Sequence, residues 1–325
     1  MSTRSAFLGA LLLTTALITG VCQAQEITIG SITERAFGYT DYTLNVSSTI
    51  HDQTYYLRSQ LEFPLDVWLV GAAISADWPN ARAPRWSLEG ALRFAVSDPV
   101  SLMYDHDWYR LPEDPFTKFS YTESGVEMAG TLTDLDGSFW LLWWGKMRLG
   151  ITVGYRHYLI KQDIIGYEGW QLDDSTGAQR PLSGTARGIY YKIVYYLPHA
   201  GIRSRLQLAD WLRWDNRLTY LQVFASDYDD HLLRNKVSAA DVHGAGGNLR
   251  CEFSLIQTSA SGALPFASLY ADLTYLQAWG DQTQSWYGDD PASPDEDDTG
   301  QVVSGIPHDV ESLQLNIGFR IGLVF

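Results

Sequence analysis

The sequence has little cysteine, few basic residues and, past its first residues, no long apolar run. It holds two cysteines, of which only Cys251 lies outside the apolar N-terminal segment, so no intramolecular disulfide is expected. The longest apolar run after residue 24, "FWLLWW" at 139–144, is far shorter than the ~18 residues of a membrane helix. The 23 basic and 38 acidic residues give a formal charge of −15, which disfavours nucleic-acid binding. This charge suits cationic partners, or solubility alone.

Common catalytic signatures are also missing. The sequence contains no G-x-S-x-G nucleophile elbow, no H-E-x-x-H zinc motif and no Gly–Lys phosphate loop. Cys251 alternates with polar residues in "NLRCEFSLIQ" and belongs to the apolar set, which predicts an inert small hydrophobe. Carboxylates and histidines are therefore the main candidates for chemistry.

The N-terminus predicts export. Arg4 precedes an apolar run from Ala6 to Val21, and small residues follow up to Ala24. This is the pattern of a secretory signal peptide at residues 1–24, followed by one domain at 25–325. Val21 before Cys22 argues against a lipoprotein. Loss of Arg4 makes the charge of the remaining chain −16.

The last segment predicts a strand with one apolar and one polar face. In "LQLNIGFRIGLVF" (313–325), every second residue is apolar, and the chain ends on Phe325. A period of two is that of a strand. A terminal aromatic strand resembles those of outer-membrane barrels, and a strand of a soluble sandwich is the alternative. The 19 Tyr and 12 Trp fit the aromatic girdles of a barrel.

The same alternation recurs along the chain and predicts an all-β fold. We expect a ten-stranded antiparallel transmembrane β-barrel, because closure removes every unpaired edge in lipid. The links alternate between short turns and long polar segments at 99–116, 163–185, 227–245 and 280–310, which predicts long extracellular loops. The ten predicted strands are 27–46, 55–77, 86–98, 117–132, 141–162, 186–209, 214–226, 246–260, 265–279 and 311–325.

The predicted fold places the protein in the outer membrane, in contact with its lipid, as a barrel that we expect to be monomeric. One long link contains "YGDDPASPDEDDTG" (287–300), which is acidic and contains proline. It lacks the ordered ligand spacing of a calcium loop, so a solvated loop is favoured.

Two clusters of ionisable residues lie in predicted loops after strands three and seven. "MYDHDWYR" (103–110) follows the third strand, and "DYDDH" (227–231) follows the seventh. With both termini periplasmic, these loops meet at the extracellular rim from opposite sides. In an extended chain, side chains two apart face the same way. Asp105 and Asp107 then face an aligned Asp229 and His231.

This set suits hydrolysis by activated water. A carboxylate bonded to imidazole fixes its tautomer and stabilises the imidazolium, so that the histidine can take a proton from water. Two adjacent carboxyl groups tend to hold one proton between them, which can be donated to a tetrahedral intermediate. No covalent intermediate is needed.

The two motifs resemble the active-site segments of the omptins, ten-stranded outer-membrane endopeptidases of Gram-negative bacteria. The resemblance lies in D-x-D-W of "YDHDW" and D-x-D-x-H of "SDYDDH". It implies Asp105 and Asp107 as the catalytic carboxylates, Asp229 and His231 as the water-activating dyad, and no cofactor. It implies that Asp227 binds a basic substrate residue, so that cationic peptides are cut next to Arg or Lys.

Some family features are altered. A second pocket acid is expected near the first strand, where Glu34 and Asp41 are the candidates. The family binds lipopolysaccharide as an activator through Tyr, Glu and Arg on the fifth strand, where this chain has Tyr155, His157 and Leu159. A further basic ligand on the sixth strand is replaced by Val194. Lipopolysaccharide therefore stays a possible activator with its binding positions only partly kept.

Three other functions fit part of the pattern. Three carboxylates and a histidine can also hold a divalent metal ion, which chelation would test. An inactive barrel of the same fold would be a surface adhesin or scaffold. A passive pore is the third possibility, although inward residues such as Arg148, Arg250, Glu252 and Arg320 can pair and fill a narrow barrel.

Overall fold

Most of the residues that the structure describes lie in long antiparallel strands. The computed structural model describes residues 26–50, 53–80, 83–112, 114–173, 176–257, 263–291 and 297–325, so the predicted signal peptide lies outside it. No helix in these ranges has the length and hydropathy to cross a membrane. The elements are β1 (Glu26–Ile50), β2 (Gln53–Pro64), β3 (Trp68–Asn80), β4 (Ala83–Ala95), β5 (Met103–Arg110), β6 (Thr117–Trp144), β7 (Met147–Leu172), β8 (Gln179–Ala209), β9 (Leu212–His231), the 3-10 helix η1 (Leu232–Arg234), β10 (Lys236–Ile256), β11 (Leu264–Trp286) and β12 (Val302–Val324).

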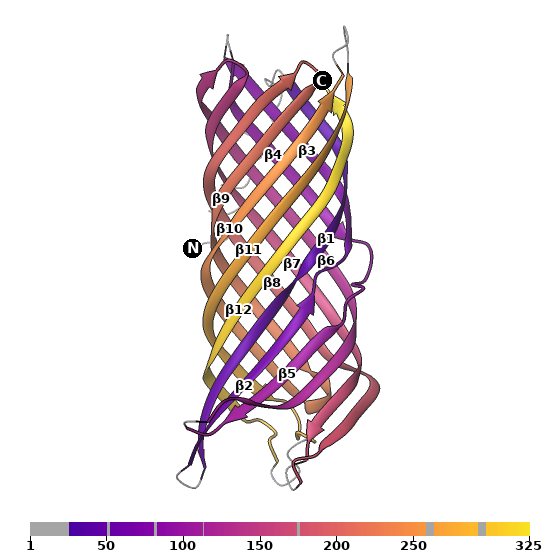
Figure 1. Ribbon diagram of the computed structural model, residues 1–325, viewed down its shortest axis with the longest axis vertical. Coiled ribbons are helices and arrows are strands. Elements are labelled where there is room, and N and C mark those ends of the chain that lie inside the picture. Colours follow the sequence, from indigo (N-terminus) through magenta and orange to yellow (C-terminus); the bar gives the residue numbers. More distant parts are fainter. Residues whose placement is uncertain are drawn as a thin grey trace, which may run out of the picture.

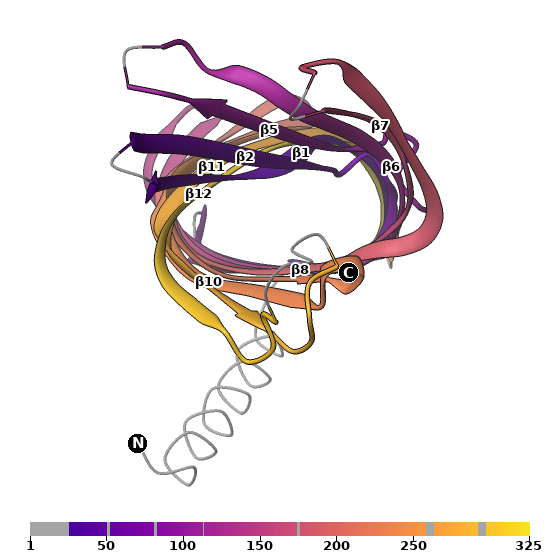
Figure 2. The ribbon, with the colours of Figure 1, turned by 90° about the horizontal axis from the view of Figure 1, so that it is seen from below.

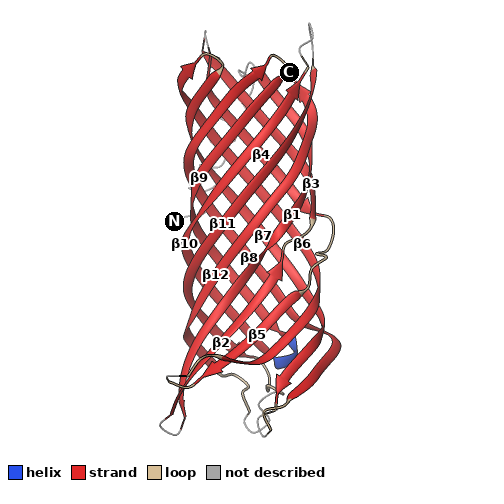
Figure 3. Ribbon diagram, viewed as in Figure 1, coloured by secondary structure: helices blue, strands red, loops and turns tan. Residues whose placement is uncertain are grey.

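The sheet closes on itself. Strand β1 pairs with β12 along most of its length. On its other side, the first part of β1 pairs with β3 and its second part pairs with β2, which closes the ring. Each level therefore contains a ring of ten strands, seen end-on in Figure 2. Phe325 lies at one end of this cylinder, and β2, β5 and η1 lie at the other, which we call the site end (Figures 1 and 3). The predicted all-β class and the number of strands around the ring are confirmed.

Two predicted strands are interrupted. The segment 55–77 divides into β2 and β3, and β1 changes partner between them. Gly38 lies at this change, where its carbonyl accepts the Leu65 amide (2.9 Å) and the Ala36 amide is bonded to Val67 (2.9 Å). The third predicted strand corresponds to β4 and continues, after residues 96–102, as β5. The backbone bonds of the interruption are thus partly supplied by neighbouring strands.

The predicted long loops are mostly strand, so those predictions were wrong. "MYDHDWYR" is β5, hydrogen-bonded between β2 and β6. "DYDDH" ends β9, and only η1 and Asn235 separate it from β10. Likewise β7 and β8 extend through most of 163–185, and β11 and β12 through much of 280–310. These extensions are polar on their outer face, and this composition hides a strand from a reading based on apolar periodicity.

The outer surface changes character along the cylinder. Toward the end that holds Phe325, outward side chains are large, apolar and exposed; examples are Trp144, Val153, Tyr220, Leu269 and Phe319. Toward the site end, outward positions are polar and exposed; examples are Lys161, Asp241, Asp281 and Asp309. The strands therefore continue well past the apolar band, and the site end lies beyond it.

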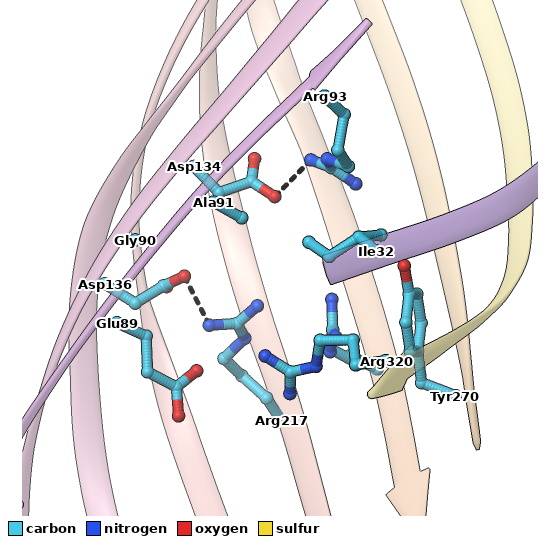
Figure 4. A pocket seen from close by; sticks show the side chains of 11 residues that line it. Ile32, Glu89, Gly90, Ala91, Arg93, Asp134, Asp136, Arg217, Tyr270 and Arg320 are labelled. Atoms are coloured by element: carbon cyan, nitrogen blue, oxygen red, sulfur yellow. Dashed lines mark hydrogen bonds and ion pairs between the residues drawn. The ribbon is translucent and has the colours of Figure 1, made fainter. Parts of the chain in front are cut away.

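Buried ion pairs fill the lumen within the apolar band. Arg93 contacts Asp134, and Arg217 contacts Asp136 (2.5 Å) (Figure 4). Arg93 also contacts Glu34 (3.0 Å). The predicted pairing of Arg250, Glu252 and Arg320 is present. The void among these side chains is about 20 Å³, room for about one water molecule.

Candidate active site

Two carboxylates of β5 face the interior together. Asp105 and Asp107 alternate with Tyr104 and His106, as expected for an extended segment. His106 lies on the outer face, where its ring stacks near Tyr121 (5.0 Å) and its Nδ1 is 3.0 Å from Lys118 Nζ. The sequence thus correctly separated His106 from the two aspartates.

The second motif forms a paired dyad. At the end of β9, His231 Nε2 is 2.9 Å from Asp229 Oδ2. Asp229 is fully buried, whereas the His231 side chain keeps 16% of its exposure. Asp230 points away and accepts a bond from the Tyr287 hydroxyl (3.1 Å). This bond to Nε2 leaves the imidazole Nδ1 available to a water molecule or substrate.

Tyr42 of β1 contacts the dyad from a different strand. Its hydroxyl donates to Asp229 Oδ2, the same oxygen that pairs with His231. Tyr42 is 1% exposed, and the centroid of its ring lies 5.9 Å from that of Phe63 and 5.0 Å from that of His308. The position of Asp229 is therefore fixed by two partners on different strands.

The three carboxyl groups of the site have opposed proton affinities. Burial raises the pKa of Asp105 well above its usual range, and the charges of Asp107 and Asp229 raise it further. Burial also raises the pKa of Asp107, although a bond from Ser59 and nearby cations oppose the rise. For Asp229, burial is outweighed by His231, Tyr42 and Lys236, so its pKa is lowered. The Asp105 and Asp107 pair thus favours holding a proton, whereas Asp229 favours its ionised form.

Lys236 adds a cation at the site. It is the first residue of β10 and pairs in register with His231. Burial, followed by repulsion from Arg234, lowers the Lys236 pKa to about 8, against the attraction of Asp229 and Asp105. Its charge helps to balance three neighbouring carboxylates.

Asp227 does not present an open carboxylate. It is 1% exposed, accepts a bond from the Tyr191 hydroxyl (2.9 Å), and its Oδ2 is 3.7 Å from His308 Nε2. Tyr191 is itself stacked on Phe63, with ring centroids 3.8 Å apart. The residue that was expected to bind a basic side chain is therefore buried, with one carboxylate oxygen bonded to Tyr191 and the other without a hydrogen-bond partner among the described residues.

Neither candidate for the second pocket acid joins Asp227. Glu34 is buried in the lumen against Arg93 and Tyr270. Asp41 faces the opposite side of β1 from Tyr42 and accepts a bond from Gln60 (2.7 Å). Within the described ranges, no group of three or more His, Cys, Asp or Glu side chains has a metal-binding arrangement.

The comparisons with known proteins decide the family. The sequence model of the Omptin family matches residues 49–254, more than half of the chain. The chain belongs to the omptin family. Both motifs lie inside the matched region. No curated protein sequence matches the chain.

A solved structure shares the fold of this omptin. The crystal structure of outer membrane protease OmpT from Escherichia coli aligns with a TM-score of 0.69, covering 92% of this chain and 97% of that chain, at 15% identity. At this identity, the match shows that the two chains share a fold and nothing further. The translocator domain of the autotransporter NalP from Neisseria meningitidis covers 96% of this chain and 95% of its own, with a TM-score of 0.31 and 9% identity.

Three contributors to the site were missed at the sequence level: Tyr42, Ser59 and Lys236. Ser59 and Tyr42 belong to strands in which apolar and polar residues alternate, as they do in the remaining strands of the chain. Lys236 fell in a predicted loop. Nothing in their local sequence distinguishes them. Strand pairing places Ser59 of β2 opposite Asp107 and Lys236 of β10 opposite His231, and the closed barrel brings Tyr42 of β1 to Asp229.

Proposed function

We propose that this omptin is an outer-membrane endopeptidase that hydrolyses peptide bonds with a water molecule activated by Asp229 and His231. The observation that carries the proposal is the arrangement of this dyad opposite Asp105 and Asp107, in one interior site at the end of the cylinder. Family membership supports the protease class. The aspartic type and the residue roles are our proposal.

In this mechanism, His231 Nδ1 takes a proton from water as the oxygen attacks the carbonyl carbon. Asp229 stabilises the resulting imidazolium. Asp105 and Asp107 share one proton, which is donated to the carbonyl oxygen as it becomes tetrahedral. Collapse returns that proton and breaks the C–N bond, while the imidazolium protonates the leaving amine. The water is thus divided between the new carboxyl and amine ends.

We propose that the apolar outer band spans the outer membrane, that the site end faces the extracellular side and that residues 1–24 are a signal peptide. The change from exposed apolar to exposed polar outward side chains supports this orientation. The barrel would be a monomer in outer-membrane lipid. Lipopolysaccharide remains a proposed activator; the chain has Tyr155 but neither the acid nor the bases of the family site.

We propose cationic peptides or proteins as substrates, with no cofactor and no nucleic-acid partner. The support is the formal charge of −15, which attracts cations over long distances. The attraction does not depend on Asp227 alone, which is buried and bonded to the Tyr191 hydroxyl. Cleavage next to Arg or Lys remains the family expectation for this chain.

Refolded protein in detergent is expected to cut cationic peptides, and Asp105→Asn and His231→Ala are each expected to lower kcat at least about 100-fold, the usual contribution of general acid–base catalysis. Matched controls are His106→Ala and Asp230→Asn, which are adjacent in sequence but face outward. Equal activity in the wild type and all four variants would exclude this mechanism. A chain that never cuts peptides would support the adhesin or scaffold alternative.

The metal alternative predicts a different response. If water is activated by the dyad alone, prolonged treatment with EDTA is expected to leave the rate of peptide cleavage unchanged. Complete loss of activity, restored by one divalent metal, would replace the proposed mechanism with a metal-dependent one.

A further inference from the structure

An open pocket lies directly beside the proposed catalytic groups. Its volume is about 140 Å³, and both Asp105 and His231 form part of its wall. Most of the remaining wall is apolar, contributed by Met103, Ile164, Ile189 and Leu233. Six elements meet here: β5, β6, β7, β8, β9 and η1. A substrate side chain in this pocket would be next to the bond that is cut.

Irregular backbone shapes this pocket. The pairing of β7 with β8 shifts twice between Ile164 and Tyr167, and Gly166 between them has a φ of +66°. Such bulges bend a strand and redirect its side chains. Across the pairing, Gly188 has no side chain, and a Cβ there would meet only Leu233 Cδ1, at 3.8 Å. The space over Gly188 is therefore left open.

The charges around the pocket do not favour a cationic side chain. Arg234 lies in its wall and is held by two bonds to Asp290 (2.9 and 2.8 Å), which fix a guanidinium close to the opening. Thr122 and Ser124 contribute only neutral polar groups. Asp105 is the single carboxylate of the wall, and its raised pKa favours the neutral acid.

We propose that this pocket is a specificity subsite for an apolar substrate side chain, of about the size of Leu or Phe, adjacent to the scissile bond. The inference rests on the proposed endopeptidase function and narrows its substrate class. A cavity of comparable size lined by Leu, Ile and Phe stays dry and binds benzene. The substrate is then a cationic peptide that is cut beside an apolar residue, and the buried Asp227 is not its main determinant.

The test compares peptides that share one cationic framework and differ only in the residues flanking the cleaved bond: Ala, Leu, Phe, Lys or Glu. Leu or Phe is expected to give a kcat/KM at least about tenfold above Ala and Lys, as for a few methylenes in an apolar pocket. Mass spectrometry of the products assigns the side of the bond. A wild-type preference for Lys or Arg over Leu on both sides would overturn the proposal.

A graded pair of variants tests the pocket itself. Gly188→Leu fills the open space, so the Leu:Ala ratio of kcat/KM is expected to fall toward one, whereas Gly188→Ala is expected to lower it only partly. Gly188 is not among the residues with positive φ, so both side chains are compatible with its backbone. An unchanged ratio in a folded Gly188→Leu protein would place the preference elsewhere and overturn the assignment.

Binding separates this proposal from the catalytic one. Asp229 is outside the pocket wall, so Asp229→Asn is expected to block cleavage and keep the subsite. Fluorescence anisotropy on this variant is expected to give a tighter Kd for the Leu peptide than for the Ala or Lys peptide. If wild type cuts no peptide, the endopeptidase proposal fails, while the same binding series still decides the subsite. Equal Kd values for all peptides would overturn it.

Discussion

At the scale of single residues, the proposed chemistry depends on which groups share a face. Asp105 and Asp107 face inward because they are two apart on one strand, and the same rule pairs Asp229 with His231. Tyr42 adds a bond from a third strand to Asp229 Oδ2. The opposed pKa directions of Asp105 and Asp229 follow from this arrangement, since one carboxylate lies among acids and the other beside cations.

Tyr42→Phe tests this support. The Tyr42 hydroxyl lowers the pKa of Asp229, so its loss raises that pKa, and Asp229 takes up a proton and stops stabilising the imidazolium at a higher pH. The acid limb of the pH–rate profile is expected to move to higher pH, with kcat/KM about tenfold lower for one lost bond to a charged group. Tyr39→Phe is the control, because Tyr39 bonds to Glu311 (3.1 Å) away from the dyad. A uniform drop at every pH would indicate a packing defect instead.

At the scale of elements, β1 joins both levels of the ring. It pairs with β3 up to Arg35 and with β2 from Tyr39, while β12 follows it on the other side. Gly38 makes this change possible: its φ is +130°, and a Cβ would lie 1.9 Å from the Leu313 carbonyl oxygen. Tyr42 follows Gly38 by four residues, so the backbone conformation at Gly38 helps to place the Tyr42 hydroxyl beside Asp229.

Gly38→Val is therefore expected to be destabilising, by at least the ~1–3 kcal/mol of a strained backbone conformation. The measurement is the fraction of protein that refolds in detergent, together with its midpoint of denaturation. Gly90→Ala is the matched control, because a Cβ there meets only ordinary contacts, the nearest being Ile74 Cγ2 at 3.8 Å. Equal refolding of the two variants would argue against a strict glycine requirement at position 38.

At the scale of the whole molecule, a cylinder with a charged interior has to balance its charges. Arg156 is fully buried and lies 3.7 Å from Asp134 and 3.6 Å from Asp272, and it donates a bond to Asn248 (2.8 Å). Such pairs cost desolvation and are stabilising only when complete. These paired side chains fill the lumen next to the site end and hold the surrounding strands together.

Arg156→Met is expected to lower the free energy of unfolding by about 3–5 kcal/mol, because it leaves buried carboxylates with fewer partners. Denaturant unfolding followed by tryptophan fluorescence measures the effect. Arg180→Met provides the comparison: that side chain is 66% exposed and 3.9 Å from Asp173, so a change of no more than about 1 kcal/mol is expected. If the two variants lose similar amounts of unfolding free energy, the buried ion pairs of Arg156 contribute little to stability.

The sequence by itself determined the all-β class, the ten strands of the ring and the pairing of residues within each motif. These features depend on period-two alternation, which is a local property of the chain. Loop lengths were misjudged, because beyond the apolar band the outward side chains are polar and the inward ones mix polar with apolar residues, so the alternation is weaker. Strand segments such as β5 and the end of β9 are held by hydrogen bonds to neighbours rather than by an apolar face.

Only the tertiary structure decided what surrounds each motif. Closure of the ring brought Tyr42 to Asp229, and pairing between neighbouring strands brought Ser59 and Lys236 to the two motifs; none of the three carries a mark of the site in its local sequence. The tertiary structure also buried Asp227 beside Tyr191 and opened an apolar pocket at Gly188. Burial and nearest neighbours are non-local properties, set by the register between strands, and they decide whether an aspartate is a ligand, an acid or a buried structural group.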